Sequence, residues 1–240
     1  MKLTYIFHSC FALEADCCNV LFDFYKDTDE TDGFVYGELL KSDKPLYVLS
    51  SHSHFDHFNP EILTWAENRN NIYFVLSKDI RGKKGIDFDD AFYIDKGEEY
   101  KDENLYIKAF GSTDVGVSFY IRIEGKKFFH AGDLNNWHWM DESTKEEVKK
   151  AEDFYHRELN DVAREVSSLD VVMFPVDPGL GTDFFRGARE FITKIPCDIL
   201  IPMHFGNEFS KIKPFEDVAK LAGCRYIPLN EKGQTIILKK

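Results

Sequence analysis

The seven residues from Ser51 to His57 concentrate side chains that bind metal ions. They read Ser-His-Ser-His-Phe-Asp-His and hold three of the eight histidines of the chain and one carboxylate. Imidazole and carboxylate groups are ligands for Zn²⁺ and other first-row divalent cations. His52 and His54 project to one side of an extended segment because they are two residues apart. Asp56 and His57 follow a bend and can reach a second ion, so the segment predicts metal-assisted chemistry.

Two further candidate ligands lie much later in the chain, each directly after an expected strand. Asp133 closes the sequence His-Ala-Gly-Asp behind strand 126–129, and His204 follows strand 198–203. Loops at strand ends are where side chains from distant segments converge. Taken singly, the aspartate could cap a turn and the histidine could be a core residue. Together with the first cluster, both become stronger candidates for metal ligands.

These segments, in this order, resemble the signature of the metallo-β-lactamase superfamily. The stretch 52–57 is similar to its first motif, and 130–133 is similar to the motif whose aspartate bridges two metals. The closing sequence Ile-Pro-Met-His at 201–204 is similar to the motif that supplies the last histidine. The resemblance covers nearly the whole chain and is nearest to the branch that includes L-ascorbate-6-phosphate lactonase. It implies an α/β fold, a four-layer αβ/βα sandwich.

The resemblance also implies a set of ligands and a cofactor. The implied ligands are His52 and His54 for a first metal, Asp56, His57 and His204 for a second metal, and Asp133 as the bridge. The cofactor is one or two divalent ions, Zn²⁺ being the first expectation and Mn²⁺ or Fe²⁺ the alternatives. Asp56 and Asp133 are the candidate catalytic carboxylates, Asp56 because it could also orient the nucleophile.

One element of the family pattern is absent. The family usually places a third histidine for the first metal after the middle strand, but residues 109–116 contain none, and Gly111 aligns with its position. Three alternatives remain open. Asp114 could replace it as an oxygen ligand, which would favour harder metals such as Mn²⁺ or Fe²⁺, unless it is a plain turn residue. His138 could approach from the loop after Asp133, or the first metal could be weakly bound or absent.

Other residues near these motifs are weaker candidates. His8 ends the first expected strand and could touch metal or substrate, or could be an ordinary strand-end histidine. His130 is expected to orient Asp133. Trp137 and Trp139 flank His138 in an aromatic loop that could form the wall of a substrate pocket or belong to the core.

The elements that must position these residues follow from hydrophobic periodicity and turn residues. Strands are expected at 3–7, 11–14, 19–24, 46–50, 72–76, 91–94, 105–109, 117–123, 126–129, 170–176, 198–203, around 227 and at 235–238. Helices are expected from Asn59 to about 68, within 141–169, from a Thr182 cap to about 194, and at 214–221. Strands cluster first and then mix with helices, which predicts two sheets with helices outside them. The glycine-rich loop 177–181 could bind an anion at the start of the following helix, but a plain connection between two elements is the simpler interpretation.

Composition narrows the class of protein. The 240 residues include 22 Phe and 11 Tyr, enough bulky material for a large core, and read as one domain over 1–240. The formal net charge of −12 repels phosphate backbones and makes nucleic acid a poor partner. No run approaches the ~18 apolar residues of a membrane span, and the first residues do not resemble a signal peptide. Five cysteines without zinc-type spacing indicate reduced thiols and a cytoplasmic location. A homo-oligomer is left open.

These observations predict a hydrolase that uses metal-bound hydroxide to cleave an ester, lactone or phosphodiester in a small metabolite. The first alternative is a nuclease or phosphodiesterase of the same fold, which would need a basic groove. The second is a non-catalytic metal-binding or ligand-sensing protein, which the missing histidine keeps open. The fold alone does not decide the substrate.

Overall fold

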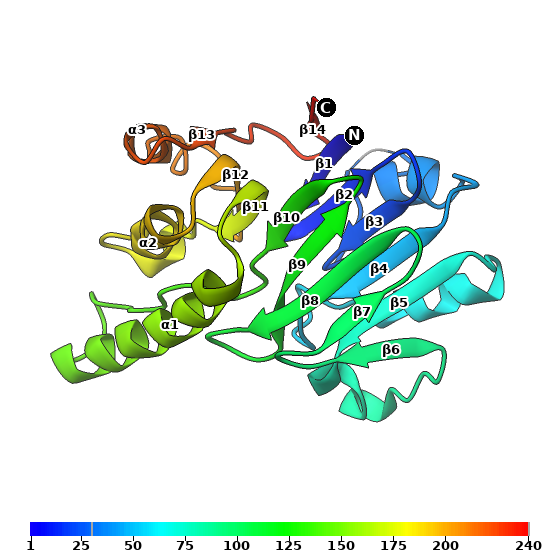
Figure 1. The fold of residues 1–240 in the computed structure, drawn as a ribbon, viewed down its shortest axis with the longest axis horizontal. Helices are drawn as coiled ribbons and strands as arrows, with labels where there is room; N and C mark the ends of the chain where they lie inside the picture. The colour runs from blue at the N-terminus through cyan, green and yellow to red at the C-terminus, as the bar shows by residue number, and fades with distance from the viewer. Residues whose placement is uncertain (30, 240) are drawn as a thin grey trace.

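Two seven-stranded sheets face each other in the computed structural model, which describes residues 1–29 and 31–239 (Figure 1). The first sheet has the order β14-β1-β2-β3-β4-β5-β6 and the second β13-β12-β11-β10-β9-β8-β7. The first comprises β1 (Lys2–Phe7), β2 (Cys10–Glu14), β3 (Asn19–Phe22), β4 (Leu46–Ser50), β5 (Ile72–Ser77), β6 (Ala91–Ile94) and β14 (Thr235–Ile237). The second comprises β7 (Glu99–Lys101), β8 (Leu105–Gly111), β9 (Val117–Ile123), β10 (Lys126–His130), β11 (Leu169–Pro175), β12 (Cys197–Met203) and β13 (Arg225–Tyr226).

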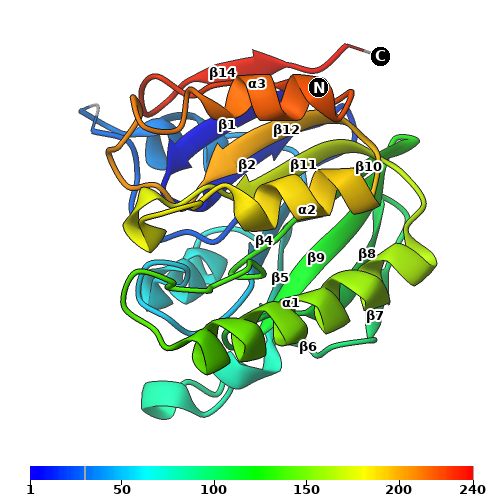
Figure 2. The same cartoon turned by 90° about the vertical axis from the view of Figure 1, so that its left-hand side faces the viewer.

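Helical layers cover the outer faces of both sheets. The helices α1 (Lys145–Glu165), α2 (Arg186–Lys194) and α3 (Phe215–Leu221) lie along the second sheet (Figure 2). The first sheet is covered mainly by a π-helical turn, η1 (Val35–Leu39), and a 3₁₀ helix, η2 (Pro60–Glu67), with short turns η3 (Lys78–Ile80) and η4 (Lys83–Gly85) nearby. A further 3₁₀ turn, η5 (Pro178–Leu180), follows β11. The predicted four-layer αβ/βα sandwich is confirmed.

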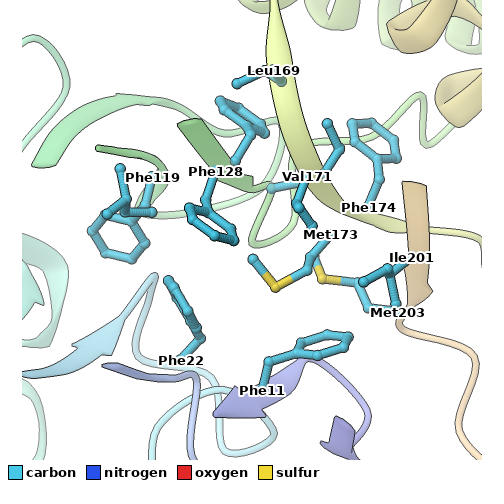
Figure 3. Packing of buried hydrophobic residues seen from close by; sticks show 14 of the residues in the cluster. Phe11, Phe22, Phe119, Phe128, Leu169, Val171, Met173, Phe174, Ile201 and Met203 are labelled. Atoms are coloured by element: carbon cyan, nitrogen blue, oxygen red, sulfur yellow. The ribbon is translucent and has the colours of Figure 1, made fainter. Parts of the chain in front are cut away.

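Strand alternation explains why the central strands are apolar on both faces. In β3, Val20 and Phe22 point into the core between the sheets, whereas Leu21 packs under the outer helical layer. Figure 3 shows Phe22 of the first sheet facing Phe119 and Phe128 of the second. Because a strand that is buried on both faces has no polar side, it appears in the sequence as a continuous apolar run.

The topology brings the carboxyl ends of distant strands to one edge. β3, β4 and β5 are mutually parallel, as are β10, β11 and β12, while β1 runs in the same direction as β3 through two antiparallel steps. Parallel strands end at the same edge of their sheet. The predicted site residues that follow β1, β4, β10 and β12 therefore all emerge at one end of the sandwich.

Several predicted elements need correction. The helix expected after Asn59 is a 3₁₀ helix, although Asn59 caps it as expected through a bond from the Glu61 amide of 3.0 Å. The helix expected to start at Thr182 begins at Arg186, because Asp183 takes a left-handed conformation with φ of +56° that interrupts the helix. The short polar strand β7 escaped prediction because it has few apolar residues.

The long helix α1 begins more sharply than the hydrophobic pattern indicated. Thr144 and Glu147 form a capping box, in which each side chain accepts a bond from the other residue's backbone amide. All five cysteines are free thiols. No helix within the described ranges is both long and apolar enough to cross a bilayer.

The packing between the sheets makes Phe128 a sensitive test of the fold. The ring is fully buried between the two sheets, so Phe128→Ala should lower the free energy of unfolding by about 3–5 kcal/mol. Guanidinium denaturation followed by circular dichroism measures this change. Leu221→Ala, which truncates a side chain that is 90% exposed, should change stability by less than about 0.5 kcal/mol. Equal effects of the two variants would contradict the described core.

Candidate metal centre

The histidine-rich loop folds back on itself directly after β4. The amides of His57 and Phe58 both donate to the carbonyl of His54, at 3.1 and 2.9 Å. This tight turn separates the loop into two parts, so that the side chains before the turn and those after it face different positions. The bend predicted between His54 and Asp56 is therefore present.

Asp23, at the end of β3, anchors this loop from below. Its carboxylate accepts bonds from the amide and hydroxyl of Ser51, at 2.7 and 2.6 Å, and pairs with Nδ1 of His57 at 2.7 Å. Burial alone would raise the pKa of Asp23, but the hydrogen bond from His57 and the charge of that ring outweigh it and lower that pKa. Sequence analysis missed Asp23; the available signal was an acid between Phe22 and Phe24 at the end of a buried strand.

The first group of candidate ligands joins the loop to the second sheet. Ligand atoms of His52, His54, Asp114 and Asp133 all lie within 4.8 Å of one another. Nε2 of His52 is 3.3 Å from Oδ2 of Asp133, and Nδ1 of His54 is 3.3 Å from Oδ2 of Asp114. Ser51 holds the other ring nitrogen of His52 at 3.0 Å. The two imidazoles and two carboxylates could hold one divalent cation.

A second group gathers on the other side of the turn. Its members are His8, Asp56, His57 and His204, again with ligand atoms within 4.8 Å of one another. Nε2 of His8 lies 3.4 Å from Oδ2 of Asp56, and the His204 amide donates to the His8 carbonyl at 3.1 Å. The structure thus places His8, a weaker sequence candidate, among these side chains.

Second-sheet groups fix the orientation of His204. Nδ1 of His204 is 3.0 Å from Oδ2 of Asp177, whose other oxygen accepts the Gly179 amide at 2.8 Å. A ring nitrogen held in this way leaves the opposite nitrogen directed at the cluster. Sequence analysis treated 177–181 as a connection and did not expect this contact.

Asp133 lies between the two groups. Its Oδ2 faces His52, whereas its Oδ1 is 3.1 Å from Nε2 of His57 and 3.5 Å from Nε2 of His204. Burial would raise the pKa of Asp133, but the rings of His57, His204 and His52, led by His57, lower it well below its usual range. One carboxylate oxygen therefore faces each group, the arrangement that a bridging ligand requires.

Several buried polar atoms at the centre lack a hydrogen-bond partner within the described residues. They are Nε2 of His8, His52 and His57, and Oδ1 of Asp133. The last two atoms lie 3.1 Å apart but are not aligned for a hydrogen bond. Unsatisfied buried nitrogen and oxygen atoms are costly, and natural proteins rarely retain them without a bound partner. Their lone pairs converge from both groups, so the residues present fit divalent cations.

The region of the missing histidine is resolved by two local contacts. A Cβ built on Gly111 would lie 1.9 Å from Oε2 of Glu158 on α1, so a side chain at this position would point away from the cluster. Asp114, three residues later, instead lies beside His54. The structure therefore brings Asp114 to the first group of candidate ligands and leaves Gly111 outside it.

His138 does not approach the cluster. The ring is buried, its Nε2 lies 3.3 Å from the Asp183 carbonyl, and its Nδ1 accepts the Met140 amide at 3.2 Å. Both ring nitrogens are engaged elsewhere, so the structure does not bring His138 to the first group of ligands.

The aromatic loop borders a cavity at the centre. This cavity of about 370 Å³ is lined by Thr113, Asp114, Asp133, Trp137, Trp139, Asp177 and His204. The two indoles stack with their centroids 6.3 Å apart, and Trp137 Nε1 donates to the Asp133 carbonyl at 2.8 Å. Trp137 and Trp139 thus form a wall beside the candidate ligands, as in the first of the two interpretations of this loop, a pocket wall rather than a part of the core.

His130 supports the turn before Asp133 through the backbone. Its Nδ1 accepts the Gly132 amide at 3.2 Å, its Nε2 donates to the Ser9 carbonyl at 2.8 Å, and its ring stacks on Phe22. This pattern requires a neutral imidazole with the proton on Nε2. Burial is the main cause that lowers the pKa of His130.

Comparison with known proteins agrees with this geometry. A family model described as a beta-lactamase superfamily domain matches residues 2–204, and the chain therefore belongs to that family. A UPF0173 metal-dependent hydrolase of Methylacidiphilum infernorum is 30% identical over 152 residues, 55% of this chain and 62% of that relative. The alignment thus spans less than two thirds of that relative. A UPF0173 protein of Pyrococcus furiosus is 25% identical over 226 residues, 90% of this chain and 88% of that protein.

A solved structure supports the same fold. A metallo hydrolase of the archaeon Ignicoccus hospitalis superposes with a TM-score of 0.69 at 18% identity, covering 100% of this chain and 98% of that one. The resemblance to the metallo-β-lactamase superfamily of metal-dependent hydrolases is confirmed. Membership in its lactonase-like branch stays a prediction.

The neutral state of His130 can be measured directly. Long-range ¹H–¹⁵N spectra should show one protonated nitrogen, Nε2, and a ring that stays neutral below the usual histidine pKa of about 6.5. Because the folded pKa is lowered, the contribution of His130 to stability is complete above about pH 6.5 and is lost as pH falls toward the folded pKa. A ring that titrates at its ordinary pKa would contradict the two backbone hydrogen bonds.

Proposed function

We propose that this protein is a hydrolase that uses one or two divalent metal ions to cleave an ester, lactone or phosphodiester bond in a small metabolite. The proposed ligands are His52, His54 and Asp114 for one ion, His8, Asp56, His57 and His204 for the other, and Asp133 as the bridge. The observation that carries the proposal is the convergence of unpartnered, buried ligand atoms from both groups. His8 and Asp114 extend the ligand set inferred from the family resemblance.

Asp114 is proposed to take the place of the missing third histidine. Its carboxylate is half-exposed and 3.3 Å from His54, so it can reach an ion held by that ring without leaving solvent entirely. An oxygen ligand there makes the first site harder than a three-histidine site, which favours Mn²⁺ or Fe²⁺ as alternatives to Zn²⁺.

The surrounding residues would control the reacting groups. When bound, divalent cations would lower the pKa of a shared water and polarise the substrate oxygen. Asp56 stays ionised, because His8 and His57 outweigh the effect of burial and lower its pKa. Its carboxylate can accept a hydrogen bond from the attacking water and orient it. Trp137 and Trp139 would limit access of bulk water to one side.

The cavity next to the ligands bears on the alternative functions. Its lining combines two tryptophans with carboxylates and, among the described residues, includes neither lysine nor arginine. A nuclease needs cationic side chains along the phosphate backbone, so this lining supports a small substrate. We also propose a cytoplasmic location, because the five cysteines are free thiols. A non-catalytic role would be favoured if fully metal-loaded protein turned over none of the bond types proposed above.

Metal content tests the proposed role of Asp114. Protein purified without chelator should contain about two equivalents of metal per chain, and Asp114→Ala should retain about one, because the second group keeps its ligands. Elemental analysis by mass spectrometry measures both. Asp114→His, which restores an imidazole ligand, should return the content toward about two.

A matched control separates ligand loss from general charge loss. Asp90 is exposed and lies outside the cluster, so Asp90→Ala should leave the metal content unchanged. One equivalent in wild type and in Asp114→Ala would contradict Asp114 as a ligand. No metal in any variant, even after supplementation, would overturn the proposed function.

Turnover distinguishes the roles of the carboxylates. Metal-loaded wild type should hydrolyse at least one of p-nitrophenyl acetate, γ-butyrolactone and bis(p-nitrophenyl) phosphate, and chelation should abolish this activity. Asp56→Asn keeps the shape of the side chain but binds a cation less well and orients water poorly, so kcat should fall by about 10²-fold or more. Asp90→Asn should retain full activity. Unchanged kcat in Asp56→Asn would exclude its catalytic role.

A further inference from the structure

A second cavity adjoins the metal centre on the side of the histidine loop. It has a volume of about 490 Å³ and is lined by Tyr25, Ser53, His54, Phe55, Phe58, Asn59, Pro60, Lys83 and Ile86. His54, a proposed metal ligand, forms part of its wall. This cavity therefore opens directly beside the position where bond cleavage is proposed to occur.

The lining of this cavity is mainly apolar and includes an unusually exposed ring. Phe55 is 69% exposed although it lies between two proposed ligands in an ordered turn. Its ring meets Tyr25 edge-on, with centroids 5.7 Å apart and an interplanar angle of 81°. Leaving a phenyl ring in water forgoes the stabilisation that burial provides. A bound apolar group would cover the exposed ring.

Each of the two cavities is bordered by a proposed ligand of the same metal ion. His54 borders the Phe55 cavity, Asp114 borders the Trp137–Trp139 cavity, and the ligand atoms of these two residues are 3.3 Å apart. A substrate with its reacting bond at the ligands could therefore extend one substituent into each cavity. The site has room for two substituents of different shape.

The charges of the lining restrict those substituents. Lys83 is the one lysine among the described residues that line either cavity, and no arginine joins it. Asp114, Asp133 and Asp177 face the other cavity. A multiply anionic chain would meet little compensating charge, whereas an uncharged apolar chain would displace water from Phe55 and Ile86.

We propose that the Phe55 cavity is a substrate subsite for an apolar chain, and that the substrate is a carboxylic ester or lactone carrying such a chain of four or more carbons. This inference rests on the proposed hydrolase function for the reaction, but the apolar subsite itself does not depend on metal chemistry. Phe55 is the specificity-determining residue: its ring would cover one side of the chain, while His54 would help to hold a metal ion next to the reacting bond.

The chain-length preference of hydrolysis tests the subsite. Covering a methylene fully should raise kcat/KM about fourfold, and covering it by half about twofold. Hexanoate has four more methylenes than acetate, so partial covering should make kcat/KM for p-nitrophenyl hexanoate at least about tenfold higher than for the acetate in wild type. Phe55→Ala should reduce this hexanoate-to-acetate ratio by about threefold or more. Phe92→Ala provides the control, because this ring is also exposed, at 41%, but does not line the cavity.

A binding measurement separates failure of the subsite from failure of the hydrolase proposal. In zinc-loaded protein, titration with 1-hexanol should shift the amide NMR signals of Phe55, Phe58 and Ile86, with ethanol binding at least tenfold more weakly. Hexanol binding without hydrolysis of any carboxylic ester, lactone or phosphodiester would overturn the hydrolase function and retain the apolar subsite. Hydrolysis without chain-length preference, or hexanol binding unchanged in Phe55→Ala, would overturn the subsite.

Discussion

The candidate metal centre depends on the hydrogen bonds of one buried carboxylate, that of Asp23. It accepts both the amide and the hydroxyl of Ser51 and orients the ring of His57, so one side chain fixes the start and the end of the histidine loop. It also lies 3.9 Å from Nδ1 of His130 on the second sheet. A buried ion needs several hydrogen bonds to remain charged. These same bonds give the loop its rigid shape.

The site shows how the two sheets support chemistry that neither could build alone. Loops of the first sheet supply His8 and the residues that follow β4, whereas the second sheet supplies Asp114, Asp133 and His204. The buried side chains between the sheets pack the two sheets against each other (Figure 3), and the ligand atoms meet at the strand ends. The grouped imidazoles and carboxylates partly compensate one another in charge, and divalent cations would satisfy the remaining lone pairs.

Much of this arrangement could be predicted from local sequence. The cluster His52–His57 has a spacing that admits few other interpretations, and β4 was expected with the bounds that it has. Local sequence left open whether Asp114 lies at the site, because the path of the loop after β8 depends on contacts with distant residues such as His54. His138 was a plausible ligand by sequence distance from Asp133, yet its ring is engaged with Asp183 and Met140. Thr182 has good capping chemistry, but the left-handed Asp183 shifts the start of the helix.

The layered α/β class and the chemical nature of the candidate ligands could be inferred from sequence, because hydrophobic periodicity and side-chain type are local properties. The tertiary structure decided which carboxylate stands beside His54, which groups hold the rings of His57 and His204, and where the two cavities open. Asp23 and Asp177 carry no local motif. Their positions follow from strand order and from the contact between the sheets, which depend on pairing between residues that are far apart in the chain.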